Sequence, residues 1–298
     1  MEKVKITFLG TGDAIPTKKR NHTAILVSFV KENILIDCGE GTQRQFKIAG
    51  ISPTKITKIL FTHWHGDHFF GLPGLIETLR MHEYKKTLEI YGPKGTKNKI
   101  SLLEKIMGGQ KIKIKVKSVD SKFIDEPSFS VEAIPMSHGT PANAYSIKIK
   151  DKIRLNKAKL RKLKLPNSPL LKKLQQGKTI TFKGKKIKPS QVSYIEKGKK
   201  ITFILDTKNN PNTIKIAKSS DLLICESAFL SKDSKKASEH NHLTAKQAAE
   251  IAKKAKVKSL VLTHISQRYE SHLDDIEKEA KKIFKNTKLA KDFMSIEI

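Results

Sequence analysis

The sequence contains little cysteine: only Cys38 and Cys225 occur in its 298 residues. Two cysteines cannot build a disulfide framework, and neither belongs to a CxxC pair of the kind used for zinc binding or redox exchange. We therefore expect both to be small buried residues in a reducing compartment. The length is sufficient for one large α/β domain or two smaller ones.

Long apolar runs are also missing. The sequence contains no stretch of about 18 apolar residues, so we expect no membrane-spanning helix. The N-terminal segment passes directly into a strand-like alternation, without the apolar core or the cleavage site of a secretory signal peptide. The sequence thus predicts a cytoplasmic protein with no membrane partner.

Acidic residues are scarce relative to basic ones. The chain has 29 Asp and Glu against 59 Lys and Arg, a formal net charge of +30. Such a surface binds polyanions indiscriminately unless the charge is organised. Residues 152–188 contain fourteen Lys or Arg and no Asp or Glu, whereas lysines elsewhere are mixed with acids. We infer a general lysine bias together with one basic segment, residues 151–195, which we expect to protrude from a globular body and bind phosphates.

One short run, HxHxDH, concentrates groups that bind metal ions. His63, His65, Asp67 and His68 directly follow the apolar, strand-like residues 59–61. Imidazole nitrogen and carboxylate oxygen are the ligands that zinc takes in catalytic sites, where it also keeps a position for water. The spacing lets His63 and His65 reach one ion, and Asp67 and His68 a second.

Three further candidate ligands each end an apolar strand pattern. His138, Asp206 and His264 follow the patterns at residues 128–136, 201–205 and 259–263. Residues that follow buried strands converge at one edge of a sheet, so we expect all three to meet the HxHxDH run. Seven ligands suffice for two ions that activate a hydroxide and stabilise an in-line displacement at phosphorus. These ligands accept Zn²⁺, Mn²⁺ or Fe²⁺.

With its flanking segments, this ligand set resembles the metallo-β-lactamase superfamily and, within it, the ribonuclease Z family of tRNA 3′ endonucleases. PTKKRN at residues 16–21 is similar to the family's P-x-K-x-R-N loop, and residues 61–74 are similar to its metal motif. HLT at residues 242–244 resembles its H-x-T motif, and LTHISQRY at residues 262–269 its last ligand segment. PLLKKL, at residues 169–174, lies where the family carries a tRNA-binding exosite.

The resemblance covers nearly the whole chain and implies both a fold and an activity. The fold would be an α/β, four-layer αββα sandwich over residues 1–298, with the basic arm inserted at residues 151–195. The activity would be zinc-dependent removal of the 3′ trailer of precursor tRNA by hydroxide attack on the phosphodiester, which leaves a 3′ hydroxyl. The family usually works as a homodimer in which one subunit's arm serves the other's active site.

The resemblance also implies roles for individual residues. Each subunit would hold two zinc ions. His63, His65 and His138 would bind the first ion, Asp67, His68 and His264 would bind the second, and Asp206 would bridge them. Asp67 would orient or deprotonate the attacking water, His242 would protonate the leaving 3′ oxygen, and Glu226 would position His242. Substrate contacts would come from Lys18, Arg20, Asn21, Lys172, Lys173 and Arg268.

Two departures from the family pattern are visible. Lys208 stands where the family often has an arginine after the bridging aspartate, and residues 225–228 keep only the glutamate of the family's His-Glu-Ala-Thr segment. Two alternative functions also stay open. A small-substrate phosphodiesterase or thioester hydrolase of the same fold would explain the metals but not the acid-free arm. A non-catalytic, zinc-stabilised RNA-binding protein would explain the charge but not Asp67, His242 and Glu226.

Overall fold

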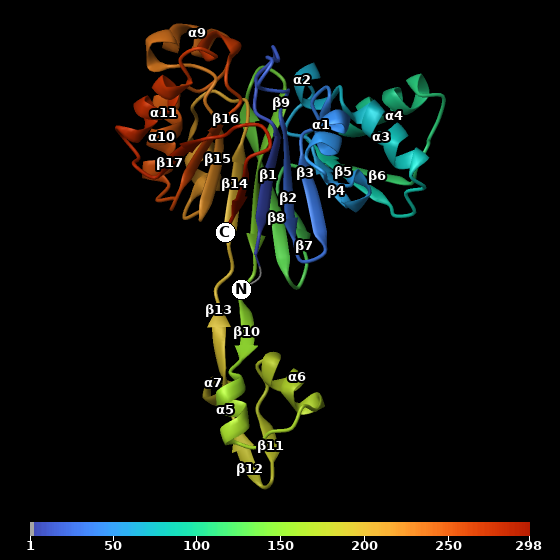
Figure 1. The fold of residues 1–298 in the computed structure, drawn as a ribbon, viewed down its shortest axis with the longest axis vertical. Helices are drawn as coiled ribbons and strands as arrows, with labels where there is room; N and C mark the ends of the chain where they lie inside the picture. The colour runs from blue at the N-terminus through green and yellow to red at the C-terminus, as the bar shows by residue number, and fades with distance from the viewer. Residues whose placement is uncertain (1–2) are drawn as a thin grey trace.

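Within residues 3–298, which the computed structural model describes, two seven-stranded sheets pack face to face (Figure 1). The first two residues of the predicted N-terminal segment lie outside this range. In spatial order, the first sheet contains β18 (Ser295–Glu297), β1 (Lys5–Gly10), β2 (Ala24–Phe29), β3 (Glu32–Ile36), β4 (Lys58–Leu60), β5 (Leu88–Gly92) and β6 (Ile114–Ser118). The second contains β17 (Thr287–Leu289), β16 (Leu260–Thr263), β15 (Leu222–Glu226), β14 (Lys200–Ile204), β9 (Pro141–Ile149), β8 (Phe129–Ser137) and β7 (Lys122–Asp125).

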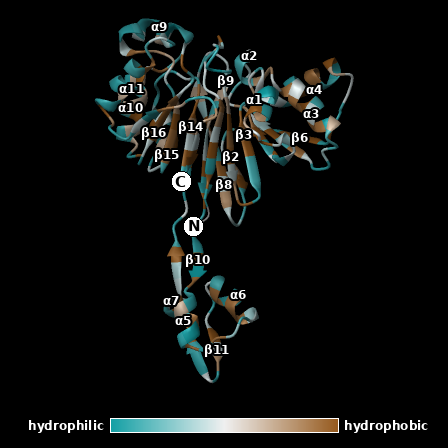
Figure 2. Cartoon of the chain, in the orientation of Figure 1, coloured by the Kyte–Doolittle hydropathy of each residue, from teal (hydrophilic) through white to brown (hydrophobic). Residues whose placement is uncertain are grey.

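Apolar side chains from both sheets form the central core. Phe8 and Ile25 of the first sheet belong to the same buried cluster as Tyr145 and Phe203 of the second. Hydropathy colouring shows these apolar strands in the middle of the body and more polar helices outside them (Figure 2). Burial of this apolar surface is the main favourable term for joining the two sheets.

Helices cover the outer face of each sheet. The first sheet packs against α1 (Thr42–Ile48), α3 (Leu72–Met81) and α4 (Thr96–Ile106), and the second against α8 (Pro211–Ala217), α10 (Ala245–Lys254) and α11 (Leu273–Lys281). Two short helices, α2 (Gly66–Phe69) and α9 (Ser234–Glu239), lie in connecting segments. The resulting order of layers confirms the predicted αββα sandwich. No helix in the described part of the chain has the length and apolarity needed to cross a bilayer.

Local sequence explains where the long helix α10 begins. The Thr244 side chain accepts from the backbone N–H of Gln247, and the Gln247 side chain accepts from the backbone N–H of Thr244. This reciprocal capping box satisfies two backbone donors that the first turn leaves without partners. Small buried residues on one face, such as Ala248 and Ala252, then let the helix lie close to the second sheet.

Several neighbouring strands run parallel, and this places their ends together. In the first sheet β3, β4, β5 and β6 are parallel, and in the second β14, β15, β16 and β17 are parallel. The carboxyl ends of parallel strands meet at one edge of their sheet. The C-terminal strand β18 pairs antiparallel with β1 and so completes the first sheet from the other end of the chain.

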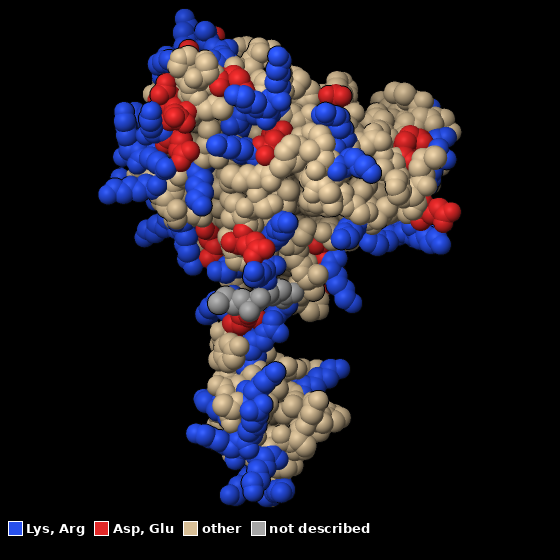
Figure 3. Space-filling view, in the orientation of Figure 1, with Lys and Arg blue, Asp and Glu red and all other residues tan. Residues whose placement is uncertain are grey.

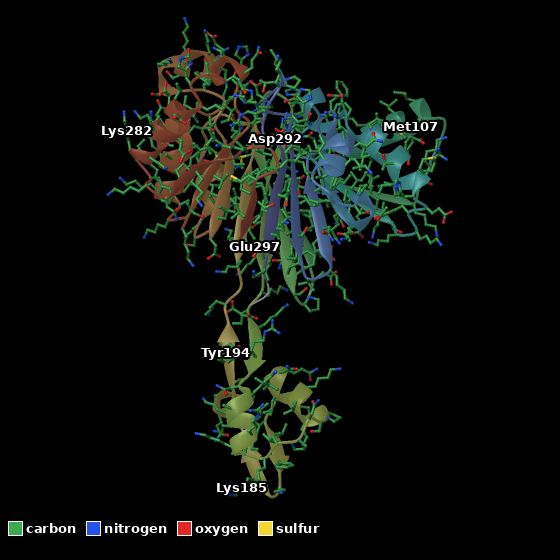
Figure 4. All side chains as sticks on the ribbon, viewed as in Figure 1. Met107, Lys185, Tyr194, Lys282, Asp292 and Glu297 are labelled. Carbon is green, nitrogen blue, oxygen red and sulfur yellow. The ribbon has the colours of Figure 1, made fainter. Side chains whose placement is uncertain are left out.

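Residues 152–196 form an extension that projects away from the two sheets (Figure 1). It contains β10 (Lys152–Leu155), α5 (Lys157–Lys162), α6 (Pro169–Gln175), β11 (Ile180–Phe182), β12 (Lys185–Ile187), α7 (Pro189–Val192) and β13 (Ser193–Glu196). An antiparallel β10–β13 pair connects it to the body, and it has its own buried cluster around Leu160, Leu174 and Val192. Lys185 lies at its far tip and Tyr194 nearer the body (Figure 4).

Candidate metal centre and catalytic pocket

The predicted ligands come together at the ends of the strands. The segment after β4 and the start of α2 supply four of them, the β8–β9 turn supplies His138, and Asp206 and His264 follow β14 and β16. The ligands form two groups, and within each group all the ligand atoms lie within 4.8 Å of one another. The first group is His63, His65, His138 and Asp206, and the second is Asp67, His68, Asp206 and His264. The first four ligands in sequence come from the first sheet and the last three from the second, so the cluster lies across the junction of the sheets.

Asp206 is the common member of both groups. Its Oδ2 lies 3.5 Å from His63 Nε2 and 3.7 Å from His138 Nε2 on one side. The same oxygen lies 3.2 Å from His68 Nε2, and its Oδ1 lies 3.3 Å from His264 Nε2. Asp206 therefore lies between the two groups, and its role as a bridging ligand stays a prediction.

The donor set fits divalent metal ions. His63 Nε2 is buried and has no hydrogen-bond partner among residues 3–298, while His65 Nδ1 and His138 Nε2 face each other at 3.1 Å. Burial, with the charge of neighbouring His68, lowers the pKa of His63 well below its usual value, which favours the neutral imidazole that a metal requires. Burial raises the pKa of Asp206, but the surrounding imidazoles of His264, His68 and His63 outweigh it and hold that pKa well below its usual range.

Asp37 contacts the ligand cluster, and the sequence interpretation did not single it out. This fully buried carboxylate, which follows β3, lies 2.7 Å from His68 Nδ1 and accepts two hydrogen bonds from Thr62, through the backbone N–H and the hydroxyl. A carboxylate on the far nitrogen fixes the orientation of a ligating imidazole and raises its basicity. The signal was available, because Asp37 follows the apolar residues 34–36 as His138, Asp206 and His264 follow theirs.

His242 and Glu226 form a second polar unit beside the ligand cluster. His242 Nδ1 lies 2.9 Å from Oε2 of buried Glu226, whose Oε1 accepts the backbone N–H of Thr207 at 2.6 Å. The His242 ring centroid is 5.3 Å from that of His264. Burial lowers the pKa of His242, but the Glu226 carboxylate, with help from Asp206, outweighs it and raises the pKa to about 9. This shift favours the protonated form of His242 at neutral pH.

A pocket of about 350 Å³ gives access to these groups. Its lining includes Asp67, Asp206, His242 and His264, together with residues 13–15 and 266–268, Phe229 and His240. One pocket therefore gives access both to five of the candidate metal ligands and to His242.

The six predicted substrate contacts occupy different environments. Lys18, Lys172 and Lys173 are exposed, with the last two on α6 of the extension. Arg268 is exposed and lines the pocket. The Asn21 side chain donates to the backbone carbonyl of Glu40 at 2.7 Å and so holds its own loop.

Arg20 differs from its predicted role as a substrate contact. Its side chain is only 3% exposed, and Nη1 donates to the Thr11 hydroxyl at 2.7 Å and to the Ala290 carbonyl at 2.8 Å. Asp292 completes the group by accepting from the Thr11 hydroxyl and from the backbone N–H of Asn21. A buried guanidinium with these partners holds the loop, and a contact between Arg20 and RNA stays a prediction.

We expect Arg20→Met to lower the free energy of unfolding by about 2–4 kcal/mol, because it leaves buried acceptors without their donor. Chemical denaturation measures the change. Lys18→Met in the same loop is the control, and its effect should stay within about 0.5 kcal/mol because Lys18 is exposed. Unchanged stability combined with weakened RNA binding in the Arg20 variant would restore the substrate role.

Two family models match parts of the chain. A family model described as "Beta-lactamase superfamily domain" matches residues 174–265, and one described as "Anti-Pycsar protein Apyc1" matches residues 4–161. The second match ends within the extension and so leaves out Asp206, His242 and His264.

Full-length relatives are more informative. The chain is 42% identical over 275 residues to ribonuclease Z of Nanoarchaeum equitans, covering 91% of this chain and 86% of that protein. It is 39% identical over 300 residues to ribonuclease Z of Archaeoglobus fulgidus, covering 99% and 97%. The crystal structure of human tRNase Z, short form, superposes with a TM-score of 0.71 at 28% identity, covering 98% of each chain.

Proposed function

Because the chain belongs to the ribonuclease Z family, it is a tRNA 3′ endonuclease, and we propose that it removes the 3′ trailer of precursor tRNA and leaves a 3′ hydroxyl. The observation that supports this most is the grouping of the seven candidate ligands beside the Glu226–His242 pair, with five of the ligands and His242 lining one pocket. The two buried, free cysteines agree with a reducing compartment, so a cytoplasmic location is part of the proposal.

The proposed site holds two divalent ions, either zinc or Mn²⁺ or Fe²⁺ in its place. The first would be bound by His63, His65 and His138, the second by Asp67, His68 and His264, and Asp206 would contact both. When bound, such ions lower the pKa of water and stabilise negative charge at phosphorus.

The protein's own side chains direct the proton transfers. The surrounding histidines lower the pKa of Asp67 below its usual range against the effect of burial, so its carboxylate stays ionised and can accept a hydrogen bond from the attacking water. Glu226 holds His242 through Nδ1, which leaves Nε2 as the atom that would donate to the departing 3′ oxygen. Water attack and oxygen departure thus use separate groups of the same pocket.

We also propose that the extension binds the tRNA backbone. Lysines and arginines lie over much of its visible surface (Figure 3). Contacts to phosphates fix the register of an RNA without reading its sequence, which suits an enzyme that must accept many tRNAs. Strand β9 separates the pocket from the extension, because His138 precedes it and Lys152 follows it. Its nine residues put about 30 Å between the two within one subunit. This separation supports a homodimer in which the extension of one subunit serves the pocket of the other.

Neutralising four extension lysines should weaken tRNA binding and leave turnover of a small phosphodiester intact. For Lys172, Lys173, Lys185 and Lys186 changed together to Gln, the slope of log affinity against log salt should fall by about 0.9 for each lost phosphate contact. Binding titrations at several salt concentrations measure the slope, and bis(p-nitrophenyl) phosphate reports the pocket.

A matched variant changes four exposed lysines of the body, Lys253, Lys254, Lys278 and Lys282, to Gln. It removes the same charge and should alter the slope much less. Equal losses in the two variants would assign the affinity to overall charge and remove the specific role of the extension.

Two substrates test the function itself. Incubation with a 3′-extended precursor tRNA should yield one cut, with a 3′ hydroxyl on the tRNA. Hydrolysis of bis(p-nitrophenyl) phosphate without any cut in the tRNA would instead show a small-substrate phosphodiesterase. Tight tRNA binding with neither cleavage would show a non-catalytic RNA-binding protein.

A further inference from the structure

His138, a candidate ligand of the first ion, contacts a backbone carbonyl from a distant part of the chain. Its Nδ1 lies 2.9 Å from the carbonyl oxygen of Asn241, which is 103 residues away. A carbonyl oxygen can only accept a hydrogen bond, so Nδ1 carries the proton and Nε2 has the lone pair that a metal requires. This Nε2 lies 3.1 Å from Nδ1 of His65, inside the first ligand group. The Asn241 carbonyl thus fixes which nitrogen of His138 faces the first ion site.

Asn241 holds this position because it ends helix α9 in a left-handed conformation. Its φ is 59°, and its backbone N–H donates to the Ser238 carbonyl at 3.3 Å. The next backbone N–H, that of His242, donates to the Ala237 carbonyl at 2.8 Å. These two bonds are the Schellman arrangement, in which glycine is the commonest residue at the left-handed position and asparagine is also used. The left-handed turn therefore sets the direction of the Asn241 carbonyl.

The turn that carries His138 packs closely against the end of α9. Gly139 has a φ of 76°, and a Cβ atom at this position would lie 3.2 Å from Nδ2 of Asn241. The ring centroids of His138 and His242 lie 5.1 Å apart. Two left-handed turns thus meet beside the pocket, one with a candidate metal ligand and the other with the candidate proton donor.

We propose that Asn241 is a positioning residue that couples filling of the first ion site to placement of the proton donor. The inference rests on the proposed function, in which His138 binds the first ion and His242 donates to the leaving oxygen. The carbonyl of Asn241 supports His138, and the next residue along the chain is His242, so both depend on one backbone turn. Such coupling is reciprocal, because a turn that supports the bound ion is stabilised by that ion to the same extent.

Helix α10 ends in the same way and provides a matched control. Lys256 has a φ of 53°, and the N–H groups of Lys256 and Val257 donate to carbonyls of the last turn with the spacing found in α9. Lys256 is exposed and belongs to neither ligand group. A β-branched residue is strained at positive φ, so Asn241→Val and Lys256→Val impose the same local strain, only the first of them beside His138. Asn241→Gly keeps the left-handed turn without strain.

The first measurement is the affinity for Zn²⁺, obtained by competition with a chelator and fitted to two sites. His65→Ala removes a ligand of the first group alone and so identifies the constant that belongs to the first site. Asn241→Val should weaken this constant about 10-fold, the usual effect of losing an outer partner of a ligating histidine. Asn241→Gly and Lys256→Val should stay within about two-fold of the wild type, because the turn beside His138 is kept.

The second measurement is hydrogen exchange of the His242 backbone N–H with and without Zn²⁺. The ion should slow this exchange in the wild type and in Lys256→Val, and much less in Asn241→Val. At saturating Zn²⁺, Asn241→Val should still cut precursor tRNA at least about 10-fold more slowly than the wild type, because His242 is misplaced. It should hydrolyse bis(p-nitrophenyl) phosphate within a few-fold of the wild type, since that leaving group departs without a proton.

Unchanged Zn²⁺ affinity in Asn241→Val would overturn the proposal. An equal loss in Lys256→Val would assign the effect to general strain, and an equal loss in Asn241→Gly would assign it to the amide side chain, so both also overturn it. If Asn241→Val does not fold, Asn241→Ala applies a milder strain, should weaken the constant about 3-fold, and has Lys256→Ala as its control. Zn²⁺ binding is measured without RNA, so a wild type that binds the ion but does not cut precursor tRNA refutes the proposed function separately.

Discussion

Cleavage of precursor tRNA should fall by about 10⁴-fold or more in Asp67→Ala, while affinity for the tRNA stays within about two-fold. Asp67 Oδ2 lies 3.2 Å from His68 Nε2 and 3.4 Å from His264 Nε2, at the centre of the proposed second ion site. The substitution removes a metal ligand and the acceptor for the attacking water together, and such effects are worth several kcal/mol each. Affinity survives because exposed lysines of the extension would supply most of it.

Single-turnover cleavage and equilibrium binding separate these two effects, and elemental analysis should show less metal per chain in the variant. Asp120→Ala is a suitable control, because Asp120 is an exposed aspartate that follows strand β6 but lies outside the ligand groups. Cleavage at the wild-type rate by Asp67→Ala would exclude this carboxylate from the chemistry.

His242→Ala should slow cleavage of precursor tRNA by about 10²–10⁴-fold, the usual contribution of a general acid. The same variant should hydrolyse bis(p-nitrophenyl) phosphate within a few-fold of the wild type, because p-nitrophenolate leaves without being protonated. Asp67→Ala should lose both activities, so the pair of substrates separates proton donation from the rest of the site. Equal losses on both substrates in His242→Ala would contradict a proton-donor role.

Glu226→Gln provides a pH signature for the same assignment. A general acid must be protonated, and with a pKa of about 9 His242 loses its proton only as the pH rises through that value. Removing the Glu226 carboxylate removes the main influence that raises this pKa, so the alkaline fall in cleavage rate should move to lower pH. A glutamate with a purely structural role would lower the rate without moving the profile.

The convergence of distant ligands could be predicted because it depends on strand ends. His138, Asp206 and His264 each follow an apolar run, and the carboxyl ends of such strands share an edge. Asp37 also follows an apolar run, so the same argument places it at this edge. Its partner is the far nitrogen of His68, and the sequence has no signal for such a supporting contact. Arg20 could not be placed from sequence, because one of its partners, Ala290, lies 270 residues away in the chain.

The fold was predictable where strands are long and apolar and less so at the sheet edges. Strands β17 and β18 have three residues each, too few for an alternation of apolar and polar residues to be recognised. Pairing of β18 with β1 joins the two ends of the chain, which no local pattern indicates. Helices α5, α6 and α7 are at most seven residues long, so they present no sustained apolar face in the sequence.

The position of the ligand cluster across the two sheets has a consequence for biosynthesis. A nascent chain leaves the ribosome with the HxHxDH run long before His264, and strand β18, which pairs with β1 in the first sheet, emerges later still. Any fragment that ends before residue 264 lacks a ligand from the second sheet, however well its first half folds. The proposed metal centre would therefore be complete only once His264 has been synthesised and its strand has joined the second sheet.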